Sequence, residues 1–379
     1  MAWGVDPLLV LAVMALVVVL YTYAAYGALV IFLGKFAPKP IRGRADYEPT
    51  VSVCLAVHNG SQHITKKLLN LPELEYPPEK LEFLVFSDGS TDSTNRLVAE
   101  LALLDPRIRL LVSERRCGKP AALNRMRAAA SGEVLLLCDV RQLLAKKSLR
   151  SLVNSLSDPS IGCASGSLIL TGNSGAGAYW RYEHLIRVSE ARLGSTVGVS
   201  GCLYAVRRAE MPELPDDILL DDMYVPLRMA LSDRKRIVFA EGAQAYDDAC
   251  DDEHEFPRKV RTLAGNYQLF AKLPSLLVPG VNPMWFQLTS HKLLRLLCPW
   301  ALVVLFLSSG SLAWHSQLSA LATVGWRAMF GAQVVFYALA MLGSRASRIG
   351  ILPRTFVLLN VAALFGLWRF LRGTQAVTW

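Results

Sequence analysis

The stretch from Leu81 to Thr94, LEFLVFSDGSTDST, joins an apolar run to a turn of short polar residues. The run predicts a buried strand over Leu81–Phe86, and the residues after the turn predict a helix over Thr91–Leu104. An Asp at the end of a strand, such as Asp88, can hold a pair of ribose hydroxyls, and the neighbouring Gly89 lets a ligand approach the backbone. The turn alone would equally be an ordinary N-cap, so its meaning depends on the segments around it.

The same alternation of strand and helix extends in both directions from this turn. We expect further strands at Val51–Val57, Ile108–Val112 and Val134–Cys138, and helices around Ile64–Leu69 and Pro120–Ala130. Apolar strands separated by helices are typical of an α/β fold with a mostly parallel sheet and helices on both faces. His58 and Asn59 follow the first strand and Asp139 follows the last, so polar groups gather at the carboxyl edge, where open sheets bind ligands.

Hydrophobic residues make up 53% of the 379 residues, and long apolar stretches lie near both ends. Leu8–Leu33 contains no charged residue and exceeds the roughly 20 residues that a transmembrane helix needs. It is too long for the core of a signal peptide, and no small-residue cleavage site follows it. Further apolar stretches lie at about Leu293–Leu312, Ala328–Leu342 and Thr355–Leu371, so we expect four membrane spans.

The distribution of Lys and Arg around these stretches indicates their orientation. Lys35, Lys39, Arg42 and Arg44 follow the first span, and Arg345, Arg348 and Arg354 lie between the third and fourth. Arg327 is the only such residue between the second and third spans. Because Lys and Arg favour the cytosolic side, the residues between the first two spans are expected in the cytosol, in a multi-pass protein of the plasma (inner) membrane.

Four regions follow from these patterns. Residues 1–45 are expected to form a transmembrane helix with a basic flank, and residues 46–250 the α/β domain. Residues 251–292 would form an interfacial segment, and residues 293–379 the remaining transmembrane helices.

The net charge of +9 raises the question of a nucleic-acid partner. No basic helix and no stripe of basic and aromatic residues is present, so we expect none. Basic residues at the ends of membrane spans, facing anionic membrane lipid, explain the charge better. The seven Cys are scattered without a CxxC pair, which indicates reduced, packed thiols.

Several motifs, in order, resemble the inverting family 2 glycosyltransferases, in particular the cellulose, chitin, hyaluronan and poly-N-acetylglucosamine synthase group. The resemblance covers about Val51–Leu296. Its motifs are Ala56-Val57-His58-Asn59, Phe86-Ser87-Asp88-Gly89-Ser90, Gly118-Lys119-Pro120-Ala121-Ala122-Leu123-Asn124, Cys138-Asp139-Val140-Arg141, Ser200-Gly201-Cys202, Leu220-Asp221-Asp222-Met223 and Arg258–Thr262. The resemblance implies a GT-A fold and a nucleoside diphosphate sugar as donor, most often a UDP-sugar.

The same resemblance implies a role for each motif. The nucleotide-sugar would be bound by His58, Asn59, Asp88, Gly89, Lys119, Asp139, Arg141, Arg258 and Arg261, and the acceptor would lie near Ser200 and Gly201. Asp222 would be the catalytic base, with Asp221 orienting or tuning it. In an inverting transfer, a base removes the proton of the acceptor hydroxyl, and cations neutralise the leaving diphosphate. Without the resemblance, Asp222 would be interpreted as the N-cap of the helix that follows.

Two motifs depart from the pattern of that group. The DxD position reads Asp139-Val140-Arg141, so the second metal-binding carboxylate is missing. Mg²⁺ or Mn²⁺ could still bind through Asp139 and the phosphates, or Arg141 could replace part of the metal's charge. Arg258–Thr262 lacks the Gln and Trp of QxxRW, and in processive synthases that Trp lies at the acceptor terminus.

Two further segments each allow two interpretations. Ala178–Leu193 mixes aromatic residues with Arg, so it is either a helix lying on the membrane or an ordinary surface helix. The acidic residues between Asp247 and Glu255 could bind a metal, but they lack a rigid ligand spacing and favour a solvated loop.

The leading hypothesis is an enzyme of polysaccharide or cell-envelope biosynthesis that transfers a sugar to a lipid-linked or polysaccharide acceptor at the cytosolic membrane face. One alternative is a processive synthase that also secretes its product, with a second copy of the chain or an export partner completing the channel. A different alternative is an inactive nucleotide-sugar-binding subunit of a synthase complex. The altered DxD and QxxRW motifs suggest it, and the intact Asp221-Asp222 pair opposes it.

Overall fold

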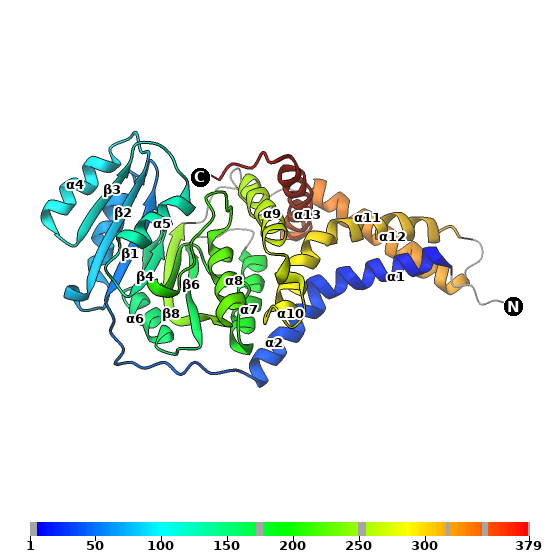
Figure 1. Cartoon of the computed structure of the whole chain (residues 1–379). Helices are drawn as coiled ribbons and strands as arrows, with labels where there is room; N and C mark the ends of the chain where they lie inside the picture. Colours follow the sequence, from blue (N-terminus) through cyan, green and yellow to red (C-terminus); the bar gives the residue numbers. More distant parts are fainter. Residues whose placement is uncertain (1–5, 172–176, 249–254, 316–318, 343–347, 378–379) are drawn as a thin grey trace.

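The computed structural model describes residues 6–171, 177–248, 255–315, 319–342 and 348–377. These residues form an α/β domain from which an arm of long helices extends (Figure 1). The arm contains α1 (Pro7–Leu20), α11 (Leu294–Leu312) and α12 (Ala320–Leu342). The last helix, α13 (Arg348–Arg372), returns to the domain and packs along α9 (Glu255–Lys272).

A mixed sheet lies at the centre of the domain, in the strand order β3-β2-β1-β4-β7-β6-β8-β5. The strands are β1 (Val51–Val57), β2 (Leu81–Asp88), β3 (Ile108–Ser113), β4 (Val134–Cys138), β5 (Leu143–Leu144), β6 (Ile161–Thr171), β7 (Leu203–Arg207) and β8 (Arg236–Asp248). Strands β1 to β4 are parallel, β7 runs antiparallel to its neighbours β4 and β6, and β6 is parallel to β8. The expected α/β fold with a mostly parallel sheet is therefore confirmed.

Strand β1 shows why the central strands are apolar throughout. All of its residues are buried, and they alternate between two cores. Val53 and Leu55 join the core formed with α3 (Ile64–Asn70) and α6 (Ser148–Leu156). Cys54 and Ala56 join the core on the other face. That core includes α5 (Lys119–Ala129) and α8 (Asp221–Asp233), and the remaining helix of the parallel half is α4 (Thr94–Leu104).

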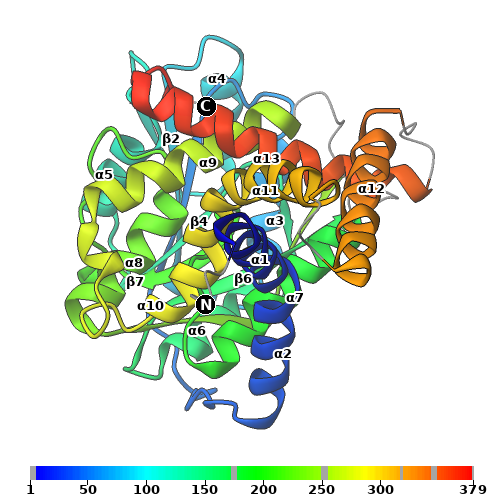
Figure 2. The same ribbon diagram turned by 90° about the vertical axis from the view of Figure 1, so that its right-hand side faces the viewer.

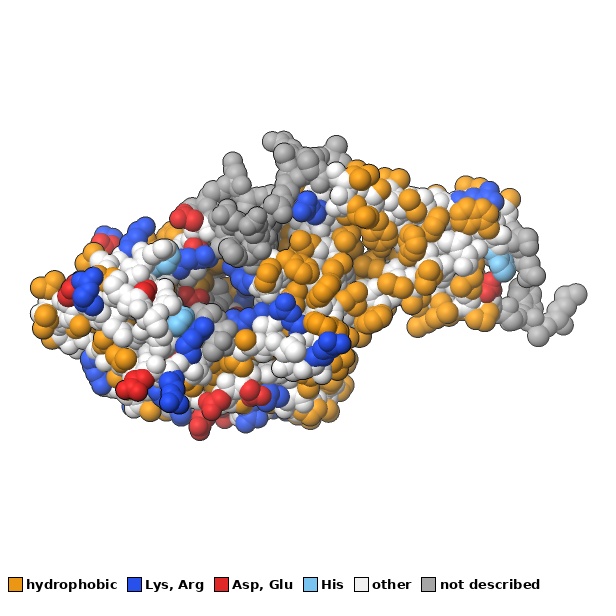
Figure 3. Space-filling model, turned by 90° about the horizontal axis from the view of Figure 1, so that it is seen from above, with side chains coloured by type: hydrophobic (Ala, Val, Ile, Leu, Met, Phe, Trp, Pro, Cys, Tyr) orange, Lys and Arg blue, Asp and Glu red, His pale blue; other side chains and the backbone are white. Residues whose placement is uncertain are grey.

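Among the described residues, four helical stretches are long and apolar enough to cross a membrane: Pro7–Phe36, Trp285–Leu312, Ala320–Leu342 and Gly350–Arg372. The first runs through α1, a π-helical turn at Tyr21–Ala25 and α2 (Tyr26–Phe36), and the second begins at α10 (Trp285–Leu288). The four expected apolar stretches are therefore confirmed as long helices, and each helix begins earlier in the chain than expected; that they cross a membrane stays a prediction. Apolar side chains cover the arm, whereas charged side chains gather on the domain (Figure 3).

Helix α7 (Gly177–Leu193) joins the domain to the first of these stretches (Figure 2). It packs closely on α2, because a Cβ on Gly34 would lie 2.9 Å from the carbonyl oxygen of Ser189. Ile186 and Glu190 are fully buried in this contact region. One face of this segment therefore packs on α2 while Leu185 and Arg192 stay exposed, and its position on a membrane surface stays a prediction.

A substitution at Gly366 of α13 would measure how tightly the last apolar stretch packs on the domain. A Cβ at this position would lie 2.9 Å from the backbone nitrogen of Ala264 in α9. We expect Gly366→Ala to force the two helices apart and to destabilise the protein by about 1–3 kcal/mol. Gly331→Ala in α12 is the control, because a Cβ there would meet no atom within 4 Å. Thermal unfolding in detergent compares them, and an unchanged melting temperature for Gly366→Ala would contradict this packing.

Candidate functional site

The predicted motifs from β1 to α8 meet at one edge of the sheet. The loops that follow β1, β2 and β4 share this edge because these strands are parallel. Strand β7 is antiparallel to β4, so the loop that precedes it, with Ser200 and Gly201, reaches the same edge. The backbone N–H of Asp139 donates to the carbonyl of Cys202 at 3.4 Å, which joins the two loops directly.

Asn59 fastens the loop after β1 to the turn after β2. Its backbone adopts a positive φ of 50°. Its side-chain oxygen accepts a hydrogen bond from the backbone N–H of Thr91 at 2.8 Å, and its own N–H donates to Ser90 Oγ at 3.1 Å. His58 Nδ1 lies 2.8 Å from the carbonyl oxygen of Asp88. Two residues predicted to bind the nucleotide-sugar, His58 and Asn59, therefore lie beside the turn with Asp88.

Asp88 is fully buried and holds the basic loop that precedes α5. One carboxylate oxygen accepts from the backbone N–H of Cys117 at 2.6 Å, and the other accepts from that of Gly118 at 3.0 Å. Gly89 has a φ of +63°, and a Cβ there would lie 2.8 Å from the backbone nitrogen of Arg116. Asp88 thus positions the loop that carries Lys119, and its contact with a nucleoside stays a prediction.

Lys119 lies between two carboxylates at the start of α5. Its Nζ is 3.0 Å from Asp139 Oδ1 and 3.6 Å from Asp221 Oδ2. Burial would lower the pKa of Lys119, but the charges of Asp139 and Asp221 outweigh it and raise that pKa. Lys119 is therefore a fixed positive charge at the sheet edge, between motifs that lie far apart in the sequence.

Asp222 lies beside this cluster, in the first turn of α8. The N-cap of this helix is Leu220, and no side chain caps it, so the interpretation of Asp222 as the N-cap is wrong. Burial and the charge of Asp221 raise the pKa of Asp222 to about 6, although Lys119 and Arg187 act in the opposite direction. A carboxylate of this kind can accept and hold a proton near neutral pH.

The loop with Ser200 and Gly201 lies against Asp222. The backbone N–H of Val199 donates to the carbonyl oxygen of Asp222 at 3.0 Å. A Cβ on Gly201 would lie 3.3 Å from Asp222 Oδ2, so this glycine keeps the space beside the carboxylate free. The predicted acceptor residues and the predicted base are therefore brought together.

Arg141, at the altered DxD position, forms an ion pair with Asp247 of β8. Asp247 is buried and also accepts from the side-chain nitrogen of Gln142 at 2.7 Å. The interpretation of the acidic segment as a solvated loop is therefore wrong for Asp247, and residues 249–254 lie outside the described residues. Within the described ranges, no group of three or more His, Cys, Asp or Glu side chains is arranged to hold a metal on its own.

The charged side chains of this cluster show whether the site could hold a divalent cation. Asp139, Asp221 and Asp222 surround one ammonium group, so carboxylates exceed cations in this cluster. The Asp139 side chain is 42% exposed, and Asp221 Oδ2 is a buried oxygen without a hydrogen bond in the described structure. These residues fit a hard cation held by Asp139 together with the phosphates of a bound ligand.

The two arginines predicted from α9 lie differently. Arg261 donates through Nη2 to the backbone carbonyl of Val377 at 3.1 Å, so it fastens the chain after α13. Arg258 is exposed in the first turns of the helix. No described hydrogen bond or ion pair joins either side chain to Lys119 or Asp222, and their contact with a diphosphate stays a prediction.

Three supporting residues carry no recognisable sequence signal. Lys67 is fully buried and donates to the carbonyl of Gln142 at 2.7 Å, beneath the loop with Asp139. Gln268 of α9 accepts from the backbone N–H of Leu219 at 2.9 Å and so holds the segment before α8. Tyr204 is fully buried, and the charges of Asp221 and Asp222 add to burial in raising its pKa. Each acts on a partner distant in the sequence.

Comparison with known proteins agrees with this geometry. Residues 52–208 match the profile described as glycosyl transferase family 2. Glycosyltransferase AglE of Haloferax volcanii is 27% identical over 135 residues, which cover 36% of this chain and 44% of that protein. Beta-monoglucosyldiacylglycerol synthase of Nostoc is 33% identical over 107 residues, covering 28% of this chain and 23% of that protein. The chain thus matches less than half of the length of these relatives.

One solved structure has a fold similar to that of most of this chain. The mannosyltransferase PcManGT from Pyrobaculum calidifontis, in complex with GDP-Man and Mn²⁺, superposes with a TM-score of 0.75 at 24% identity. The superposition covers 95% of this chain and 99% of that one. The narrower resemblance to the cellulose, chitin and hyaluronan synthase group stays a prediction, because the relatives are diverse. Residues 52–208 of this chain are thus similar to glycosyl transferase family 2, and the described structure has a GT-A-like fold.

Proposed function

We propose that this chain is a membrane-embedded inverting glycosyltransferase. It would move a sugar from a nucleoside diphosphate sugar, with UDP as the expected nucleotide, to a lipid-linked or polysaccharide acceptor at the cytosolic membrane face. The observation that carries the proposal is the placement of Lys119 between Asp139 and Asp221, with Asp222 beside them. One cluster thus offers a cation for a leaving diphosphate and a carboxylate for an attacking hydroxyl.

In this mechanism Asp222 takes the proton of the acceptor hydroxyl. The hydroxyl oxygen forms a bond to the anomeric carbon as the bond from that carbon to the diphosphate oxygen breaks. Asp222 is ionised above its pKa of about 6, so it is ready to act at neutral pH. Lys119 stabilises the charge on the departing diphosphate, and a divalent cation at Asp139 would supply further positive charge there.

The relatives support parts of this proposal and add further donors to the panel of sugars that tests it. The Nostoc relative is named for a glycosylated diacylglycerol, which favours a lipid acceptor. The Pyrobaculum structure contains GDP-Man and Mn²⁺, so GDP-sugars belong beside UDP-sugars in the donor panel. Release of nucleoside diphosphate by purified protein, with and without lipid extract, tests the proposal. A wild-type chain that binds donor but releases nothing across the panel would instead be a binding subunit.

Asp222→Asn should abolish transfer and leave donor binding intact, because the amide cannot accept the proton. The expected loss in single-turnover rate is about 10²- to 10⁴-fold. Folding should not suffer, because Asp222 caps no helix. The neutral amide also removes the repulsion between the charges of Asp222 and Asp221. In the wild type, the rate should fall as the pH drops through about 6, where Asp222 becomes protonated. Asp221→Asn is the comparison, with a smaller loss. Retention of more than about a tenth of the rate by Asp222→Asn would place the base elsewhere.

Asp139→Asn should remove most of the effect of a metal on nucleotide binding. Calorimetry measures the affinity for UDP and GDP with Mn²⁺ and with excess EDTA. In the wild type, Mn²⁺ should tighten binding, because Asp139 and the phosphates share the cation. In Asp139→Asn this gain should largely disappear. Equal affinities with Mn²⁺ and EDTA in the wild type would show that Lys119 and its neighbours neutralise the diphosphate without a metal.

The proposed topology places the α/β domain in the cytosol and the start of α12 on the opposite side. Leu103→Cys lies on α4 and is 87% exposed, so it reports on the domain. Ala320→Cys lies at the exposed start of α12. A membrane-impermeant thiol reagent added to intact cells should label Ala320→Cys and spare Leu103→Cys, which should react after lysis. Labelling of Leu103→Cys in intact cells would reverse the topology.

A further inference from the structure

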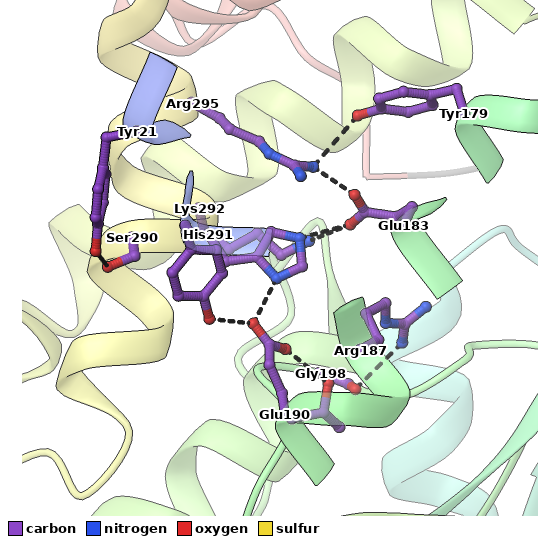
Figure 4. A network of polar contacts seen from close by, with 12 residues as sticks. Tyr21, Tyr179, Glu183, Arg187, Glu190, Gly198, Ser290, His291, Lys292 and Arg295 are labelled. Atoms are coloured by element: carbon purple, nitrogen blue, oxygen red, sulfur yellow. Dashed lines mark hydrogen bonds and ion pairs between the residues drawn. The ribbon is translucent and has the colours of Figure 1, made fainter. Parts of the chain in front are cut away.

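A buried cluster of charges joins helix α7 to the start of the second apolar stretch (Figure 4). His291 is fully buried, and its two ring nitrogens each lie 2.7 Å from a carboxylate, Glu190 on one side and Glu183 on the other. Arg295 also forms an ion pair with Glu183. Burial opposes the ionisation of Glu183, but the charges of Arg295 and His291 hold its pKa well below the usual range. The cluster therefore fixes α7 by paired charges.

Glu190 connects this cluster to two further segments. Its Oε1 accepts from the hydroxyl of Tyr26 in α2 at 2.6 Å, and its Oε2 accepts from the hydroxyl of Thr196 at 3.2 Å. Tyr182 of α7 also donates to the backbone carbonyl of Tyr23 at 2.9 Å. Helix α7 is thus held to the first two apolar stretches, Pro7–Phe36 and Trp285–Leu312, which are called the membrane-facing helices below. Through Thr196 it is also held to the loop that leads to Ser200.

Arg187, one turn before Glu190, makes a second contact with that loop. Its Nη2 donates to the carbonyl of Gly198 at 3.2 Å, and its guanidinium lies over the ring of Phe239 at 5.2 Å. The next residue, Val199, donates to the carbonyl oxygen of Asp222 at 3.0 Å. A continuous set of contacts therefore runs from the membrane-facing helices, through α7 and this loop, to the proposed base.

We propose that Arg187 is a positioning residue, which holds the loop from Gly198 to Gly201 against Asp222 and ties that geometry to the membrane-facing helices through α7. The inference rests on the proposed function, because it assigns Arg187 to the reaction at Asp222. No described hydrogen bond or ion pair joins Arg187 itself to Asp139 or Asp88, on the donor side of the site. Loss of Arg187 should therefore slow transfer without weakening nucleotide binding.

The charge of Arg187 provides a second readout, because it acts on the carboxylate of Asp222 in addition to the burial of that group. The groups that act on Asp222 are Asp221 of the same helix, Lys119 of α5, Arg187 of α7, Asp139 after β4 and Tyr204 of β7. Lys119 and Arg187 favour the ionised carboxylate, whereas Asp221 and Asp139 oppose it. Removal of Arg187 should raise the pKa of Asp222, so the acid limb of the pH–rate profile should move to higher pH.

The test compares Arg187→Met, Arg187→Lys and the control Arg192→Met. Arg192 lies on the same helix, but its side chain is 53% exposed and it pairs with Glu241 at the surface, 3.5 Å away. Arg187→Met should lower kcat by about 10- to 100-fold with unchanged donor affinity, and should move the acid limb upward. Arg187→Lys should keep the acid limb and recover part of kcat, because it keeps the charge. Arg192→Met should behave as wild type.

Hydrogen exchange of residues 197–202 supplies a measurement that needs no activity. Exchange should quicken in Arg187→Met and remain as in wild type in Arg192→Met. If Arg187→Met does not fold, Arg187→Lys is tested in its place. This variant should show faster exchange of the loop, while the acid limb of its pH–rate profile should stay where it is in the wild type. Wild-type exchange in the Arg187 variants, or an unmoved acid limb in a folded Arg187→Met, would overturn the inference. A wild type that transfers no sugar would defeat the proposed function, while loop exchange would still decide whether Arg187 holds the loop.

Discussion

The site depends on one ammonium group placed between carboxylates. Lys119, at the start of α5, pairs with Asp139, which follows β4, and with Asp221, which begins α8. It therefore joins the parallel half of the sheet to the half that contains the antiparallel strand β7. Removing one partner of a buried pair is costly, and loss of Lys119 would leave Asp221, whose side chain is 11% exposed, without its compensating charge. Removal of Lys119 would leave Asp139, Asp221 and Asp222 together without this positive charge, which would raise the pKa of Asp222 further. Binding of a diphosphate would need to draw on this same positive charge.

Much of this arrangement could be predicted from the sequence, because it rests on patterns within single segments. The continuous apolar run of β1 predicts burial on both faces, and both cores are found around Val53 and Cys54. The polar residues after β1, β2 and β4 predict the edge at which they meet, and these motifs do meet there. The four apolar stretches likewise predict four long helices, since the length of a span is a local property.

The remaining features depend on contacts between distant segments. The pairing of Arg141 with Asp247, the burial of Lys67 under the loop with Asp139, and the attachment of Arg261 to Val377 all join parts of the chain that no local pattern relates. Asp222 was open to interpretation as a helix cap because cap and base use the same residue type at the same place. Only the backbone of α8, which begins after Leu220, separates the two.

The first apolar stretch has a geometric consequence for the acceptor. Its 30 residues form a rod roughly 45 Å long, whereas the hydrocarbon core of a bilayer is about 30 Å thick. Part of the rod must therefore project beyond the hydrocarbon, or the rod must tilt strongly. The end that packs on α7 is α2, so in an upright rod α2 would act as a spacer between the bilayer and the domain. In that arrangement the length of the spacer would set the height of the sheet edge above the lipid, and an acceptor anchored in the bilayer would have to extend its reactive hydroxyl by that same distance.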